Sequence, residues 1–173
     1  FHMDGDKDYW KLIFSRFLYL VGIYGFQSFA QYYIRDKFSD QDPIVFTQFV
    51  MGSFVVVLII FSLISGANSD KGGRKRWQIA SSIIGAFGAI LLIFANSPTQ
   101  LLIFGSIMGV GLGIFLSVNW ALANQMAPKG DFGKYVGLTN LATAGSAAVA
   151  RLEGPMIDFF NNRVPGEWWG WTA

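Results

Sequence analysis

Two groups of charged residues in this chain could do chemistry, and both interrupt apolar sequence. One is the loop "ISGANSDKGGRKRWQIA" at residues 64–80, in which Asp70 is followed by a run of basic residues. The other is the pair Arg151 and Glu153, which follows a run of small residues. A basic loop can bind anionic lipid or form ion pairs, and an acid within a membrane segment can couple to an ion. Which chemistry applies depends on the solvent around the rest of the chain.

Enzyme motifs are missing from the sequence. It contains no phosphate-binding loop, no H-E-x-x-H zinc motif and no G-x-S-x-G nucleophile motif. It has no Cys, which excludes disulfides and Cys-ligated metals, and its one His is His2. We therefore expect a protein that is not an enzyme and that has neither a metal site nor a cofactor.

The composition is that of a membrane protein. Of the 173 residues 53% are hydrophobic, 17% are aromatic and only 14% are charged, too few polar side chains for a surface in water. Most apolar windows approach the ~20 residues needed to cross a ~30 Å hydrocarbon core. The sequence therefore predicts an all-α, polytopic membrane helix bundle with five transmembrane helices. The five windows are Leu12 to Ile34, Ile44 to Ser65, Trp77 to Ala95, Leu101 to Val118 and Tyr135 to Ala150.

The two ends of the sequence differ from the apolar windows. The first ten residues, "FHMDGDKDYW", have no apolar core, so they are not a signal peptide and are typical of a linker. The last eight, "GEWWGWTA", place three Trp behind a turn, as at the interfacial start of a membrane helix. We therefore expect the start of a sixth helix there. Residues 1–173 are expected to form a single membrane domain, a piece of a longer protein.

The basic residues predict how the helices are oriented, because positive charge near membrane spans is retained on the cytoplasmic side. If the spans alternate, one side holds Lys7, Lys11, Lys71, Arg74, Lys75, Arg76, Lys129 and Lys134. The other side holds only Arg35, Lys37 and Arg163. We expect a protein integral to the cell membrane with its N-terminus in the cytoplasm. No nucleic-acid partner is expected, since these residues flank spans and form no basic domain.

The charged loop contains a recognisable spacing, G-x-x-x-D-[RK]-x-G-[RK]-[RK]. Gly66 lets two helix ends approach closely, and Gly73 permits a turn that a side chain would obstruct. Asp70 can accept hydrogen bonds from free backbone N–H groups at a helix start. The residues that fit the spacing are Gly66, Asp70, Lys71, Gly73, Arg74 and Lys75.

This spacing resembles the loop that follows the second helix in each six-helix half of major facilitator superfamily transporters. The resemblance implies that charge pairs in this loop hold the cytoplasmic side closed, with Asp70 and Arg74 in that role. Alternatively, the basic residues only set the topology and attract anionic lipid.

A second, longer resemblance covers "GIFLSVNWALANQMAPKGDFGKYVGLTNLATAGSAAVARLEGPMID", residues 113–158, and "SRFLYLVGIYGFQSFAQYYIRD", residues 15–36. Both are similar to the C-terminal half of bacterial facilitators related to the glycoside and sucrose cation symporters. There the pattern runs roughly S-V-D-W-A-L-x-x-D-x-x-P, then G-K-x-x-G-L-x-N. The resemblance implies most of the C-terminal half of a twelve-helix transporter. Where those relatives carry acids, this chain has Asn119 and Gln125, which cannot titrate near neutral pH. If the acids of the relatives couple transport to protons, that coupling is lost at these positions in this chain. The acids could equally serve only to cap or pair within the scaffold.

Polar residues inside the apolar windows are candidates for a substrate cavity. Tyr24, Gln27 and Gln31 recur near one face of a helix, and unpaired polar groups in lipid cost several kcal/mol. They could line a water-filled path or form hydrogen bonds between helices. Arg16, near the inner end, is expected to extend to the lipid headgroups. The full candidate set for an unknown small, hydroxylated or amphipathic solute is Tyr24, Gln27, Gln31, Asn119, Trp120 and Asn140.

Two further patterns concern ions and packing. Glu153 is the remaining titratable candidate for ion coupling, with Arg151 nearby, and a structural ion pair to another helix is the alternative. Gly154 and Pro155 could break the helix there. Small residues one helical turn apart let a neighbouring backbone come close. This predicts a packing face at Gly105, Gly109 and Gly113.

Two functions are compatible with these patterns. The first is a secondary transporter that moves a small solute by alternating access, in contact with the lipid bilayer and an N-terminal transporter half. The second is a facilitator-derived accessory subunit that transports nothing and serves as a scaffold for other membrane subunits. The intact charged loop favours the transporter, whereas Asn119 and Gln125 favour the subunit.

Overall fold

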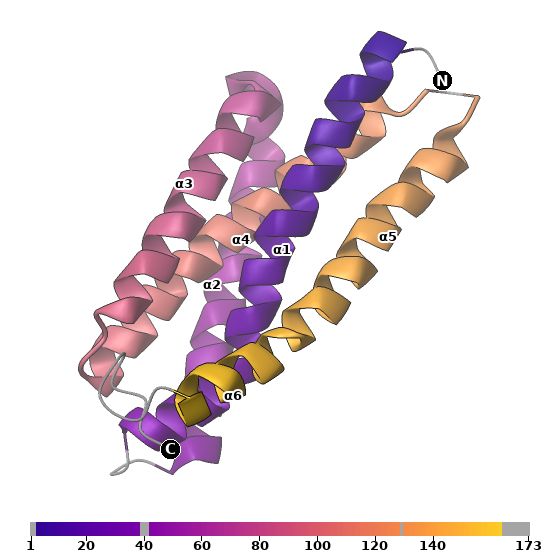
Figure 1. Ribbon diagram of the computed structural model, residues 1–173. Coiled ribbons are helices and arrows are strands. Elements are labelled where there is room, and N and C mark those ends of the chain that lie inside the picture. Colours follow the sequence, from indigo (N-terminus) through magenta and orange to yellow (C-terminus); the bar gives the residue numbers. More distant parts are fainter. Residues whose placement is uncertain (1–2, 39–41, 129, 164–173) are drawn as a thin grey trace.

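Helices account for nearly all of residues 3–38, 42–128 and 130–163, the part of the chain that the computed structural model describes. No strand occurs within these ranges, so the all-α prediction is confirmed. The helices, shown in Figure 1, are α1 (Met3–Lys37), α2 (Pro43–Gly72), α3 (Arg74–Ile93), α4 (Pro98–Met126), α5 (Phe132–Arg151) and α6 (Glu153–Arg163).

Four of the described helices are long and apolar enough to cross a membrane, namely α1 to α4. Their apolar windows span about 20 residues or more, as expected for a ~30 Å hydrocarbon core. The fifth predicted window, Tyr135 to Ala150, also forms a helix, α5, but its many small and polar residues keep it out of this apolar group. The chain is therefore a polytopic helix bundle, as its composition predicts.

Two of the long helices begin at capping residues that lie in short polar connections. Asp42 caps α2, where its Oδ1 accepts hydrogen bonds from the backbone N–H of Ile44 at 2.9 Å and of Val45 at 3.1 Å. Ser97 caps α4 by accepting from the N–H of Gln100 at 3.2 Å. A Pro follows each cap at the first helical position, where a missing N–H breaks no helical bond. These caps fix where the helices begin.

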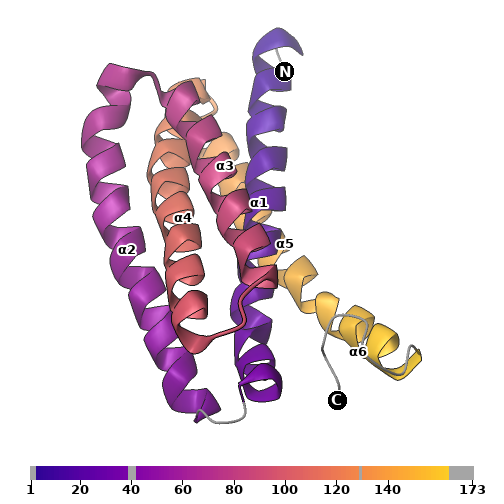
Figure 2. The ribbon, with the colours of Figure 1, turned by 90° about the vertical axis from the view of Figure 1, so that its left-hand side faces the viewer.

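Helix α4 lies at the centre of the bundle. It packs most extensively against α2 on one side and α3 on the other, while α1 packs mainly against α5 (Figures 1 and 2). The start of α1, the turn between α2 and α3, and the connection from α4 to α5 lie at one end of the bundle. We call this the signature end, because residues 66–75 lie there, and we call the other end the opposite end.

The predicted packing face of α4, formed by Gly105, Gly109 and Gly113, lies against the backbone of α2. A Cβ on Gly109 would lie 2.7 Å from the carbonyl oxygen of Phe54, and a Cβ on Gly113 would overlap the carbonyl oxygen of Leu58. Gly105 has more room, since its Cβ would lie 3.7 Å from Cγ1 of Val50. The contacts advance four residues at a time on both helices, so α2 and α4 run parallel and close together.

A second set of glycines brings α3 close to the other side of α4. A Cβ on Gly111 would lie 2.6 Å from the backbone nitrogen of Gly85, and one on Gly88 would lie 2.7 Å from that of Met108. Glycines on two sides of α4 therefore allow both neighbouring backbones to approach it.

The structure describes part of each end of the chain. Most of the opening segment is helical, because α1 already begins at Met3. The chain turns at Leu152, between α5 and α6, next to the predicted break at Gly154 and Pro155. The predicted start of a sixth helix in "GEWWGWTA", like Lys129, lies outside the described residues.

Candidate functional site

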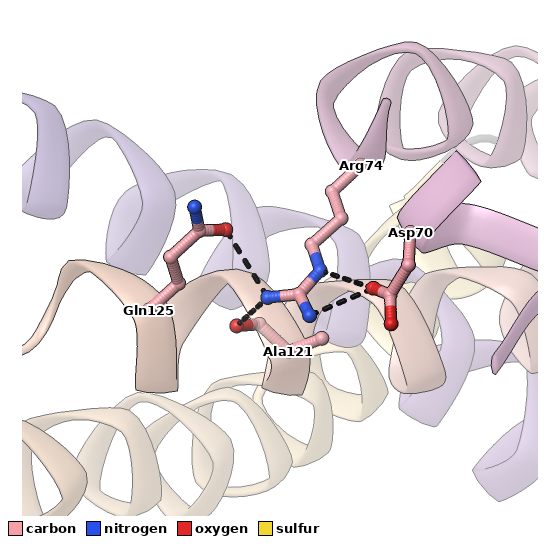
Figure 3. Close-up of polar contacts among 4 residues, drawn as sticks. All are labelled: Asp70, Arg74, Ala121 and Gln125. Carbon is pink, nitrogen blue, oxygen red and sulfur yellow. Dashed lines mark hydrogen bonds and ion pairs between the residues drawn. The ribbon is translucent and has the colours of Figure 1, made fainter. Parts of the chain in front are cut away.

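Arg74 joins three elements at the signature end. Its Nη2 lies 2.7 Å from Oδ1 of Asp70, and its Nε donates a hydrogen bond of 2.9 Å to the same oxygen (Figure 3). Its Nη1 donates to the carbonyl oxygen of Ala121 at 2.9 Å and to Oε1 of Gln125 at 3.1 Å. One guanidinium at the start of α3 therefore connects the last turn of α2 to the last turns of α4 (Figure 3).

The predicted role of Asp70 as a helix cap is wrong. Asp70 lies within α2, and Gly73, which caps α3, makes no side-chain cap hydrogen bond. The free backbone carbonyls at the end of α2 disfavour an anion. The guanidinium of Arg74 offsets this cost with two contacts to the carboxylate.

The glycines of the charged loop have separate roles in its geometry. Gly73 has φ of +84°, a left-handed backbone conformation that side chains oppose. A Cβ on Gly66 would lie 3.0 Å from Oγ of Ser117, so this glycine lies where α2 passes close to α4.

Lys71 and Lys75 are exposed. An open cleft of about 1060 Å³ lies beside Lys75. Its lining consists of Asp70, Gly73, Arg74, Lys75, Ala121, Leu122, Asn124 and Gln125.

Arg16 lies inside the bundle, which contradicts the expectation that it extends to the lipid headgroups. Its side chain is almost completely buried, with 2% of the residue exposed. Its Nη1 donates a hydrogen bond of 2.6 Å to Oδ1 of Asn119 on α4, and its Nε donates one of 3.0 Å to Oγ1 of Thr143 on α5. The ring of Trp120 covers the guanidinium at 4.9 Å. Because α5 packs along α1, it closes the route to the surface.

The Arg16 centre, made of Arg16, Asn119, Trp120 and Thr143, was only partly visible in the sequence. Asn119 and Trp120 were candidates for a cavity, but Thr143 was missed. Thr143 stands four residues after Thr139, whose hydroxyl lies 2.8 Å from the hydroxyl of Tyr9, so the two threonines share one face of α5. A polar face on a helix that is otherwise rich in small residues is the signal that could have identified it.

The other cavity candidates do not join this centre through hydrogen bonds. Gln27 and Gln31 are exposed on α1, and neither amide forms a hydrogen bond with any residue in the described ranges. Tyr24 is half-buried on the same helix, and Asn140 is exposed on α5. The proposed hydrogen bonds between helices are thus absent for these two glutamines within that part of the chain.

Glu153 lies at the start of α6, against α1. Its carboxylate oxygens occupy the place that a side chain on Gly25 would fill. A pocket of about 270 Å³ with aromatic walls, which include Phe26 and Phe29, lies beside it. Arg151 is exposed, and no ion pair joins Glu153 to Arg151 or to any other residue that the structure describes.

Curated relatives of this chain include transporters of inositol. The chain is 31% identical over 104 residues to Myo-inositol transporter 1 of Saccharomyces cerevisiae, covering 60% of this chain and 18% of the relative. It is 24% identical over 140 residues to Probable inositol transporter 3 of Arabidopsis thaliana, covering 80% and 23%. It is 30% identical over 108 residues to Multidrug resistance protein 3 of Bacillus subtilis, covering 62% and 21%. The chain thus spans about a fifth of the length of these relatives.

A comparison with solved structures found no significant match. The family comparison is more extensive, since residues 12–172 match the model of the major facilitator superfamily. This match includes the charged loop at the signature end and the helices that hold Arg16 and Glu153. The chain belongs to the major facilitator superfamily.

Proposed function

We propose that this chain forms most of the C-terminal half of a secondary transporter or facilitator that moves a small solute by alternating access. Membership of the superfamily supports a membrane transporter. In such a mechanism two helix bundles rock against each other around a central site. The described bundle would be one of the two, embedded in the cell membrane with its signature end in the cytoplasm.

The exposed amides of Gln27 and Gln31 carry this proposal. Both lie within a span that is long and apolar enough to cross a membrane, and neither has a hydrogen-bond partner among the described residues. Unpaired polar groups that face lipid cost several kcal/mol each. This face of α1 is therefore suited to a water-filled path or a second bundle, and its amides are suited to hold solute hydroxyl groups.

The contacts of Arg74 support a gate at the signature end. The residue holds the α2–α3 turn against the end of α4, through a backbone carbonyl and a neutral amide. These bonds span an open cleft and stand outside the bundle core. We expect them to break as the cytoplasmic side opens. The free-energy cost of breaking one or two such hydrogen bonds falls within the ~1 to 3 kcal/mol that is typical of coupling energies.

A polyhydroxylated solute is the substrate class that we propose. Two of the relatives carry inositol in their names, and amide side chains both donate to and accept from hydroxyl groups. Because Asn119 and Gln125 cannot titrate near neutral pH, Glu153 is left as the candidate for coupling to an ion. The proposal therefore takes two forms. In one, Glu153 couples solute movement to an ion, which is symport; in the other, the solute moves without a coupled ion, which is uniport.

Uptake by the full-length protein in proteoliposomes tests the proposal. We expect uptake of labelled myo-inositol or a related polyol, and a rise in KM of about 5- to 10-fold in Gln27→Ala or Gln31→Ala, the effect of one lost hydrogen bond. Gln48→Ala, also exposed but in the second turn of α2, is the matched control and should leave KM unchanged. Absence of uptake for a panel of polyols, sugars and amphipathic solutes would favour the non-transporting subunit.

A further inference from the structure

The charge of Arg16 is not compensated by any residue in the described part of the chain. The guanidinium is buried, and both of its hydrogen-bond partners, Asn119 and Thr143, are neutral. No ion pair within the described ranges includes Arg16. A buried charge without a counter-ion is costly in a low-dielectric interior. The centre therefore has a net positive charge that an anion would offset.

Two hydrogen-bond donors of the centre lack acceptors among the described residues. The Nη2 group of Arg16 has no acceptor among the described residues. The amide Nδ2 of Asn119 is buried and likewise has no partner there, because its Oδ1 faces Arg16. Two unused donors beside an unbalanced cation provide what an anion needs, namely N–H groups and positive charge. Asn119 itself is completely buried, so water does not readily replace the missing acceptor.

We propose that the Arg16 centre binds a small monovalent anion, either an inorganic ion or the carboxylate group of a small organic solute. The anion accepts hydrogen bonds from Nη2 of Arg16 and Nδ2 of Asn119. Trp120 covers the guanidinium and is only half-buried, so a shift of its ring admits the ion from the side of α4. Thr143 holds the guanidinium in position through Nε. This inference does not depend on the proposed transport activity.

Thermal unfolding of the full-length protein in detergent tests the proposal at constant ionic strength. Gluconate, a carboxylate much larger than chloride or acetate, is replaced stepwise by chloride in one series and by acetate in another. We expect a saturable rise in Tm of about 1–2 °C for a protein of ~500 residues at ten times the apparent Kd. A rise with both anions indicates a general anion site, and a rise with acetate alone indicates a site for a carboxylate group. A Tm that is unchanged, or that changes without saturation, overturns the proposal.

Two variants test whether the anion binds at the Arg16 centre or at the protein surface. Asn119→Asp supplies a carboxylate of the same size beside Arg16, so it should remove the anion-dependent rise. Asn124→Asp makes the same change at an exposed position of α4 and should keep the rise. If Asn119→Asp fails to fold, Arg16→Gln serves instead, because it removes the positive charge that attracts the anion. Retention of the full rise in the centre variant, or its loss in Asn124→Asp, contradicts the proposed site.

Discussion

Gly109 of α4 lies so close to α2 that a Cβ built on it would be 2.7 Å from the carbonyl oxygen of Phe54. A backbone carbonyl in a helix cannot move aside without disturbing its own hydrogen bond. We therefore expect Gly109→Ala to lower the free energy of unfolding by about 1–3 kcal/mol, as overpacking does. Thermal unfolding in detergent measures the change.

Gly105→Ala is the matched control on the same face of α4. Its Cβ would lie 3.7 Å from Cγ1 of Val50, an ordinary contact distance. Ala is a better helix former than Gly by up to about 1 kcal/mol, so this variant should be neutral or more stable. Equal losses of stability in the two variants would contradict a close approach that is specific to Gly109.

Two tyrosines with buried hydroxyl groups should respond in opposite ways to loss of that group. The hydroxyl of Tyr9 lies 2.7 Å from the carbonyl oxygen of Tyr135 and 2.8 Å from Oγ1 of Thr139. The hydroxyl of Tyr19 is buried without a partner in the described residues, although its ring stacks on Phe115 at 4.0 Å.

We expect Tyr9→Phe to lower the free energy of unfolding by about 1–2 kcal/mol, because it removes two buried hydrogen bonds. Tyr19→Phe should keep or raise the free energy of unfolding, because it removes a buried polar atom without a partner. Both can be measured by thermal unfolding in detergent. A loss at Tyr19 as large as that at Tyr9 would show that the hydroxyl of Tyr19 has an acceptor.

Arg74→Ala should favour the state that is open at the signature end. It removes the ion pair with Asp70 and both hydrogen bonds to α4, and we expect a shift of about 5- to 150-fold in the conformational equilibrium. Distances between spin labels at the signature end of the full-length protein measure this shift. Lys75→Ala, which removes a neighbouring exposed charge, is the control. Identical distance distributions in Arg74→Ala and the parent would rule out a gating role.

Glu153→Gln separates ion coupling from structural support. If Glu153 couples an ion, the variant should lose concentrative uptake but keep exchange. Because no described residue forms an ion pair with Glu153, the loss of stability should be small. A structural partner would instead leave a cation unpaired and lower the free energy of unfolding by about 3–5 kcal/mol. Arg151→Gln, at an exposed position, is the control, and normal uptake with normal stability in Glu153→Gln would refute both roles.

Accessibility labelling tests the orientation, because the chain has no Cys. We expect a Cys introduced at Lys75 to react with a membrane-impermeant reagent from the cytoplasm, and one introduced at Lys37 to react from outside. The basis is the excess of basic residues at the signature end. Labelling of position 37 from the cytoplasmic side alone would reverse the assigned topology.

The helices themselves could be predicted from the sequence by itself. A window of about 20 apolar residues must satisfy its backbone hydrogen bonds internally when it lies in lipid, and a helix does so through local contacts. The spacing of Gly105, Gly109 and Gly113 is also a local property, because it depends on one helix alone, and it therefore indicated a packing face. The turn at Gly73 likewise follows from residues next to one another in the sequence.

Only the tertiary structure decided what surrounds Arg16. From the sequence alone, a basic residue near the end of a span is expected to reach the headgroups. Its hydrogen-bond partners, Asn119 and Thr143, are 103 and 127 positions away. Helical periodicity says which face of α1 the arginine occupies, but not which helix covers that face. The packing of α5 along α1 settles this, and it encloses the charge within the bundle instead of leaving it at the surface.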